Sequence, residues 1–137
     1  MKFEDIKVGD TVYVEDDVIY GWSMRQSFFI PVKVARTTRT QFIIEGRGER
    51  KYKKDNGNGI GIDSRAYFLG EKASNWSDEI VKDQTKERDA FRNKITIEKG
   101  LVRFIDSIKV NINSSASLED LMKAKDLLKE AKSLLMP

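Results

Sequence analysis

Seven cationic side chains between positions 36 and 54 are the residues whose types and spacing best suit a chemical task. They are Arg36, Arg39, Arg47, Arg50, Lys51, Lys53 and Lys54. Guanidinium and ammonium groups at this density can neutralise successive phosphates of DNA or RNA without reading the base sequence. If about four of them contact duplex DNA, log K falls against log salt with a slope of about −3.6. The alternative is a solubilising sheet edge or a surface for a protein partner.

Aromatic side chains offer a second kind of contact, because bases of a single strand stack on exposed rings. Trp22 lies in a polar stretch and is the ring that we expect to be most exposed. The alternative is that the aromatic residues of a small sheet protein form its core. The rings considered for stacking are Tyr20, Trp22, Phe28, Phe29 and Tyr52.

Residue types that usually perform catalysis or bind metals are missing. The chain contains neither histidine nor cysteine, the commonest proton-transfer group and the thiolate ligand. The loop at residues 55–61 lacks the ending of a phosphate-binding P-loop, and Gly57 and Gly59 stand where a calcium loop needs side-chain oxygens. Asp16 and Asp17 are adjacent and would point to opposite faces of a strand. We therefore expect no enzymatic activity, no metal and no cofactor.

Positive charge is concentrated in the middle of the 137-residue chain, whose formal net charge is +3. Residues 33–65 carry nine Lys and Arg against four Asp and Glu, whereas residues 1–32 carry three against six. The middle third is therefore the part that attracts anionic partners. No apolar run approaches the roughly 20 residues that span a bilayer, and the first residues lack the pattern of a signal peptide. These features predict a cytoplasmic protein without membrane contact.

Short alternating segments in the first half of the chain predict an antiparallel barrel. Asp16 and Asp17 are expected to turn the chain after the first strand. Pro31 cannot donate a backbone hydrogen bond, so its part of the second strand is expected at a sheet edge or a bulge. The strands are predicted at residues 11–15, 27–36, 41–45, 49–54 and 66–69.

The period of the apolar residues changes to that of helices after Gly70. Ser77, followed by two acidic residues, is predicted to cap a helix with an apolar stripe at Ile80, Phe91, Ile95, Val102, Ile105 and Ile108. Ser117 is predicted to cap a last helix with a seam at Leu121, Ala124, Leu128, Ala131 and Leu135. This seam needs a cover: the preceding helix, giving a helical hairpin, or a second copy of the chain, giving a homodimer.

Two groups of residues resemble a known type of protein. Residues 8–14 (VGDTVYV) resemble the opening of SH3-like barrels of the KOW kind. Residues 34–41, followed by 50–52 and 55–61, look like those of small phage-encoded proteins that pair such a barrel with a C-terminal helical segment. The resemblance implies a barrel, nucleic acid or transcription proteins as partners, and a viral role in the host cytoplasm. The pattern departs from the KOW type after residue 14, so no binding residue is transferred.

The sequence thus predicts an α+β protein with two domains: an SH3-like antiparallel barrel at residues 1–70 and a helical hairpin at residues 71–137. The functional hypothesis is a non-enzymatic nucleic-acid-binding accessory protein that acts on host DNA or the transcription machinery. Its predicted binding residues are the seven cations and Trp22. The alternative is an inhibitor or adaptor that docks on a host enzyme through the barrel edge or the helical stripe.

Overall fold

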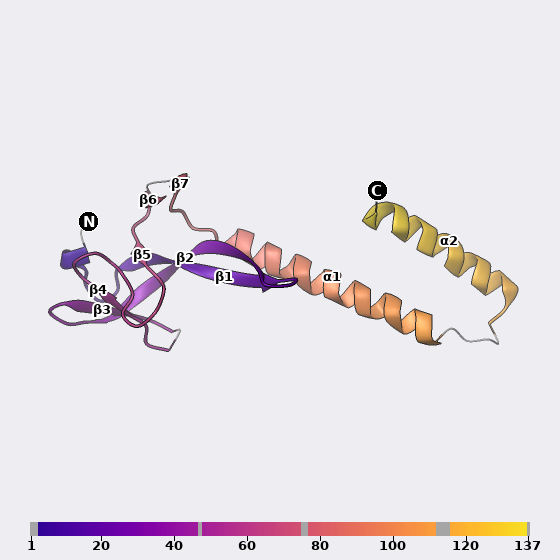
Figure 1. Cartoon of the computed structure of the whole chain (residues 1–137), viewed down its shortest axis with the longest axis horizontal. Helices are drawn as coiled ribbons and strands as arrows, with labels where there is room; N and C mark the ends of the chain where they lie inside the picture. Colours follow the sequence, from indigo (N-terminus) through magenta and orange to yellow (C-terminus); the bar gives the residue numbers. More distant parts are fainter. Residues whose placement is uncertain (1–2, 47, 75–76, 112–115, 137) are drawn as a thin grey trace. The chain divides into compact units, whose positions relative to one another are not determined.

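The computed structural model of the chain describes residues 3–46, 48–74, 77–111 and 116–136. It is an α+β structure with a curled five-stranded antiparallel sheet in the order β4-β3-β2-β1-β5, a two-stranded hairpin and two C-terminal helices (Figure 1). The elements are η1 (Phe3–Asp5), β1 (Thr11–Tyr20), β2 (Met24–Thr37), β3 (Gln41–Ile44), β4 (Lys51–Lys53), β5 (Ala66–Tyr67), β6 (Lys72–Ser74), β7 (Ser77–Ile80), α1 (Thr85–Asn111) and α2 (Leu118–Leu135).

The chain divides into two compact units, residues 1–97 and 98–137. The sheet, the β6–β7 hairpin and the first turns of α1 belong to the first unit. The sequence instead placed a boundary at residue 70. The coarse class, a curled antiparallel sheet followed by two helices, agrees with the prediction.

The β1–β2 hairpin is longer than its sequence pattern predicted. β1 continues to Tyr20, and its register with β2 runs from Thr11 opposite Lys33 to Tyr20 opposite Met24. The predicted turn at Asp16 and Asp17 is therefore wrong, because arginines hold both carboxylates within the extended strand. The chain reverses instead at residues 21–23.

β2 is an inner strand of the sheet, between β1 and β3, but pairing with β3 does not extend over its whole length. The register with β3 begins at Val34 opposite Ile44 and shifts at a bulge before Arg36. Pro31 precedes this paired part and lies opposite Tyr13 of β1. Among the described residues, β1 is thus the only strand beside β2 at Pro31, which agrees with the sheet edge expected at this proline.

The loop at residues 57–60 joins the two edges of the curled sheet. On one side, Lys53 N–H donates to the carbonyl of Asn58 at 2.9 Å. On the other side, Ala66 N–H donates to the carbonyl of Gly57 at 2.8 Å. Gly57 has φ +77°, and a Cβ there would lie 2.6 Å from the Phe3 ring, so the loop requires glycine.

The inward faces of the strands form the main core. Alternation in β1 buries Val12 and Val14, and Tyr52 is buried between exposed Lys51 and Lys53. The predicted alternation in β1 and β4 is therefore confirmed. The main core cluster consists of Ile6, Val12, Val14, Ile30, Val34, Phe42, Ile44, Tyr52 and Ala66.

The segment predicted to start the first helix is a strand instead. Ser77–Ile80 forms β7 and pairs with β6, so Ser77 is not a helix cap and Ile80 is not part of a helical stripe. α1 begins at Thr85, immediately after Gln84 bonds to β2. Gln84 N–H donates to the Phe29 carbonyl, and Gln84 Oε1 accepts from Phe29 N–H, both at 2.9 Å.

The last helix begins where the sequence indicated. Ser117 caps α2, because its hydroxyl oxygen accepts from Asp120 N–H at 3.1 Å. None of the α2 residues is buried. The predicted seam of α2 is thus exposed, with Leu121 and Leu128 both about half accessible.

Candidate functional site

The register of β2, β3 and β4 brings predicted cations onto one face of the sheet. Arg36 lies opposite Ile43, and Ile43 lies opposite Lys51 on the next strand. Directly paired residues of antiparallel strands share a face, so these three side chains form a row across the sheet. The row is on the outer face, because Phe42 and Tyr52, which alternate with Ile43 and Lys51, are core residues. Arg36 and Lys51 are therefore on the same exposed face.

Lys53 and Arg39 extend this row toward the β2–β3 turn. Lys53 lies opposite Gln41 and on the same side of β4 as Lys51. Arg39, in the turn before Gln41, lines a surface pocket of about 430 Å³ together with Lys53 and Lys54. We call Arg36, Arg39, Lys51 and Lys53 the basic face, and this hollow the basic pocket. The full lining of the basic pocket is Glu4, Arg39, Thr40, Gln41, Lys53, Lys54, Asp55 and Ile60.

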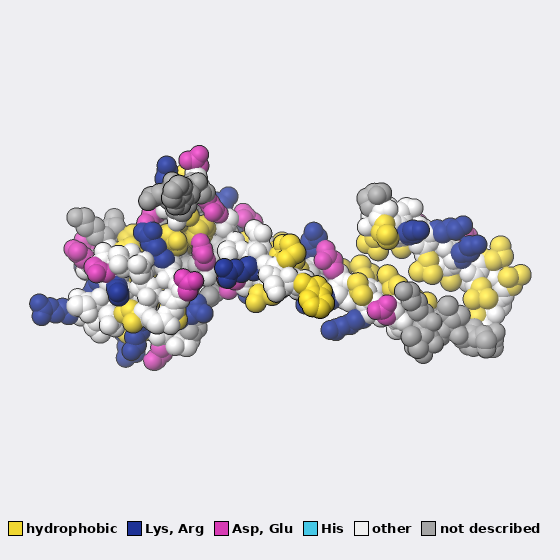
Figure 2. All heavy atoms as spheres, viewed as in Figure 1, with side chains coloured by type: hydrophobic (Ala, Val, Ile, Leu, Met, Phe, Trp, Pro, Cys, Tyr) yellow, Lys and Arg dark blue, Asp and Glu magenta, His cyan; other side chains and the backbone are white. Residues whose placement is uncertain are grey.

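Acidic neighbours compensate the basic face only in part. Arg36 forms an exposed ion pair with Glu49 at 3.6 Å. Within the described ranges, no ion pair involves Arg39, Lys51 or Lys53. Figure 2 shows Lys and Arg side chains over the end of the sheet that holds β3 and β4, with some Asp and Glu side chains among them. The predicted cations of this region thus meet on one surface and keep charge available for an anion.

Arg50 and Trp22, two of the other predicted residues, do not join the basic face. Arg50 is half-buried before β4, where its carbonyl accepts from Ile44 N–H at 3.2 Å. Arg47 lies outside the described residues. Trp22 is 97% exposed in the β1–β2 turn. This turn and Arg36 lie at opposite ends of β2, so Trp22 is remote from the basic face.

An aromatic pocket of about 470 Å³ adjoins the basic pocket. Glu4, Lys54 and Asp55 line both hollows. The other lining residues of the aromatic pocket are Phe3, Phe68, Leu69, Gly70 and Glu71. The sequence pointed to neither Phe3 nor Phe68, because 65 positions separate them and only the closed sheet brings them together. Four of the five rings considered for stacking are instead packed: Phe28, Phe29 and Tyr52 are buried, and Tyr20 is half-buried with its ring centroid 5.2 Å from that of Phe91.

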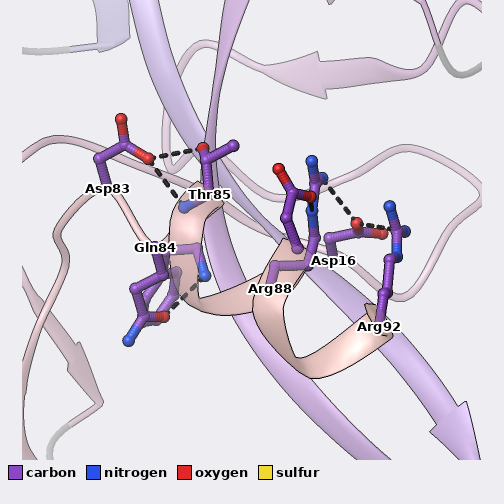
Figure 3. Close-up of polar contacts among 8 residues, drawn as sticks. Asp16, Asp83, Gln84, Thr85, Arg88 and Arg92 are labelled. Atoms are coloured by element: carbon purple, nitrogen blue, oxygen red, sulfur yellow. Dashed lines mark hydrogen bonds and ion pairs between the residues drawn. The ribbon is translucent and has the colours of Figure 1, made fainter. Parts of the chain in front are cut away.

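A separate ionic cluster fastens α1 to the β1–β2 hairpin. Asp16 Oδ2 accepts from Arg88 at 2.8 Å and from Arg92 at 2.9 Å (Figure 3). The side chains of Asp16 and Arg88 are only 13% and 16% exposed. Next to this cluster, hydrogen bonds from the hydroxyl and N–H of Thr85 hold the pKa of Asp83 below its ordinary 3.8. These contacts position the first turns of α1 against the β1–β2 hairpin.

A polar hollow beside β5 contains several acids, including Glu15, Asp17 and Asp63. Partial desolvation raises the pKa of Glu15 above 4.5, and the neighbouring charges of Asp17 and Glu79 raise it further. Two arginines in this hollow have acidic partners: Arg25 pairs with Asp17 at 3.3 Å and Arg65 with Glu71 at 2.9 Å. No group of three or more potential ligands in the described part of the chain could hold a metal ion.

Comparison of the chain with protein-family models, with curated proteins and with solved structures finds no match. In the part of the chain that the structure describes, no helix combines the length and apolar character needed to cross a bilayer.

Proposed function

We propose that this protein binds nucleic acid through the basic face, as a non-enzymatic accessory protein. The observation that carries the proposal is the row of Arg36, Lys51 and Lys53 on one exposed surface, extended by Arg39 at the turn. Such a row follows a phosphate backbone without contacting base edges, so binding is sensitive to salt and indifferent to sequence.

Salt-dependent binding tests this function. With all four side chains of the basic face on phosphates, the log–log slope for duplex DNA is about −3.6. A triple variant, Arg39→Gln with Lys51→Gln and Lys53→Gln, should reduce the slope to about −0.9. The matched control neutralises Lys123, Lys125 and Lys129 of α2, which removes the same charge from the other unit. No DNA or RNA binding at low salt, or equal effects of the two triple variants, contradicts the proposal.

The type of barrel and the biological role are also proposals. We propose that the curled sheet is an SH3-like barrel and that the protein is a phage product active in the host cytoplasm on host DNA or the transcription machinery. The strand order β4-β3-β2-β1-β5 and the loop that joins β4 to β5 support the barrel. Residues 8–14 support the KOW-like assignment through their sequence alone.

A protein partner is the second candidate, and the apolar surface of the C-terminal unit favours it. The helices leave large side chains exposed over much of their length (Figure 2), among them Leu101, Val102, Phe104, Leu121, Met122, Leu127 and Leu134. Such a surface suits an adaptor or inhibitor docked on a host protein, closure of α2 on α1 as a helical hairpin, or a homodimer.

Pull-down after nuclease treatment separates these functions. A partner retained without nucleic acid and lost in Leu121→Lys/Leu128→Lys supports the adaptor. A partner lost on digestion supports the nucleic-acid binder. Light scattering gives the molar mass of the native protein and of the same variant. A dimer in the native protein that becomes a monomer in the variant identifies the homodimer, since positions 121 and 128 both lie in the α2 seam.

A further inference from the structure

The aromatic pocket ends a series of near-parallel rings that begins in the core. The ring centroids of Tyr52 and Phe42 are 5.5 Å apart at an interplanar angle of 17°. Those of Phe42 and Phe3 are 5.8 Å apart at 5°, and those of Phe3 and Phe68 are 4.3 Å apart at 26°. Tyr52 and Phe42 are fully buried, whereas Phe3 and Phe68 are half-buried and line the pocket. The pocket therefore presents π surface that the core holds in place.

Local contacts fix these two rings. Phe68 N–H donates to Glu71 Oε2 at 3.0 Å, while Glu71 Oε1 bonds to Arg65 at 2.9 Å. Phe3 lies against Gly57, where even one added carbon would collide with the ring. Because the Phe3 and Phe68 rings are already fixed, binding of a planar ligand costs little side-chain entropy.

The charges around the basic pocket and the aromatic pocket favour different parts of a nucleotide in each. Arg39 and Lys53 lie in the basic pocket and not in the aromatic pocket. Glu4, Lys54 and Asp55 line both hollows, so the charges of the two hollows differ by Arg39 and Lys53 in the basic pocket and by Glu71 in the aromatic pocket, whose carboxylate disfavours a phosphate there. Exposed Leu69 adds an apolar wall. An anionic group is favoured in the basic pocket and a neutral ring beside it.

We propose that the aromatic pocket is a base-stacking subsite, so that the ligand is single-stranded nucleic acid with a phosphate in the basic pocket and its base on Phe68. This inference rests on the proposed function and specifies the substrate class of the same surface. A base inside a duplex is already stacked and paired, whereas an unpaired base is free to enter the pocket.

Two single-stranded oligonucleotides of equal length test this subsite, one normal and one with abasic central positions. Both carry the same phosphates, so the basic face alone binds them equally. Stacking should make the normal strand bind on the order of tenfold more tightly. Phe68→Leu, which keeps apolar bulk but removes the ring, should abolish that difference and leave abasic binding unchanged. A 2-aminopurine in the normal strand should lose fluorescence on binding the native protein and keep it with Phe68→Leu.

The outcomes separate the two proposals. Equal affinity of the native protein for both strands overturns the subsite and leaves phosphate binding by the basic face intact. Binding of neither strand at low salt overturns both. If circular dichroism shows that Phe68→Leu is unfolded, Leu69→Glu is tested in its place. Leu69 is 65% exposed and lines the same pocket, so this substitution adds a carboxylate to the pocket. Unchanged preference for the normal strand in the folded variant also overturns the subsite.

Discussion

At the scale of single residues, two adjacent aspartates in β1 have different roles. Asp16 is almost enclosed and is shared by Arg88 and Arg92, whereas Asp17 pairs with the largely exposed Arg25. Removing one partner from an enclosed ion pair leaves a charge without compensation, while exposed pairs contribute little.

We expect Asp16→Ala to lower the free energy of unfolding by about 2 kcal/mol, because Arg88 is left poorly solvated. Asp17→Ala is the matched control and should lower it by less than about 1 kcal/mol. Urea unfolding followed by circular dichroism measures both variants. Equal losses would show that the Asp16 cluster contributes no more than a surface pair.

Glu15 should make stability depend on pH in the acidic range. Its folded pKa is raised above 4.5, first by desolvation and then by Asp17, so its charged form disfavours the folded state. This penalty is present at neutral pH and disappears as the pH falls through the raised pKa toward 4.5. Glu15→Gln should therefore raise Tm slightly at pH 7 and have little effect well below pH 4.5. A gain in Tm that is the same at both pH values would contradict this assignment.

At the scale of elements, α1 is held to the hairpin by rings as well as by charges. Phe91 packs against Tyr20 at 5.2 Å and against Phe28 at 5.6 Å. Phe104, further along the same helix, is 63% exposed. The two phenylalanines of α1 therefore provide an internal comparison.

Phe91→Ala should cost about 1–3 kcal/mol of stability and speed hydrogen exchange in the first turns of α1. Phe104→Ala should change stability by less than about 0.5 kcal/mol. Hydrogen exchange with mass spectrometry reports both effects. Similar exchange in the two variants would mean that the rings do not secure the helix.

Local patterns predicted the elements that depend on local chemistry. The alternation of β1 and β4 and the Ser117 cap of α2 could both be read from the sequence. The extension of β1 through Asp16 could not, because its cause is Arg88, which is 72 positions away. Ser77 looks like a cap, yet its segment pairs with β6, since strand pairing overrides a weak local preference.

The candidate site also has one part that the sequence predicted and one part that it did not. The basic face could be anticipated because its four residues lie within 18 consecutive positions of a hairpin-linked segment. The aromatic pocket could not, because Phe3 and Phe68 meet only after the sheet curls. Trp22 is exposed as expected, but it lies in the β1–β2 turn, at the other end of β2 from the basic face.

At the scale of the whole molecule, the buried hydrophobic residues that the structure describes belong to the first unit. Every buried hydrophobic residue in the described part of the chain lies between Ile6 and Val81. Removing residues 112–137 should therefore leave Tm unchanged within a few degrees, as measured by differential scanning calorimetry. A large fall in Tm would show that α2 covers part of the first unit.

The unpaired part of β2 has a consequence for how copies of this chain behave at high concentration. Before Lys33, this strand has β1 on one side and, among the residues that the structure describes, no strand on the other, so its outward amide groups could template a foreign strand. Gln84 occupies both hydrogen-bonding groups of Phe29, and Pro31, two positions on, has no N–H to offer. The backbone N–H and side-chain Oε1 of Gln84, together with the missing N–H of Pro31, therefore leave fewer groups at this margin with which a foreign strand could pair.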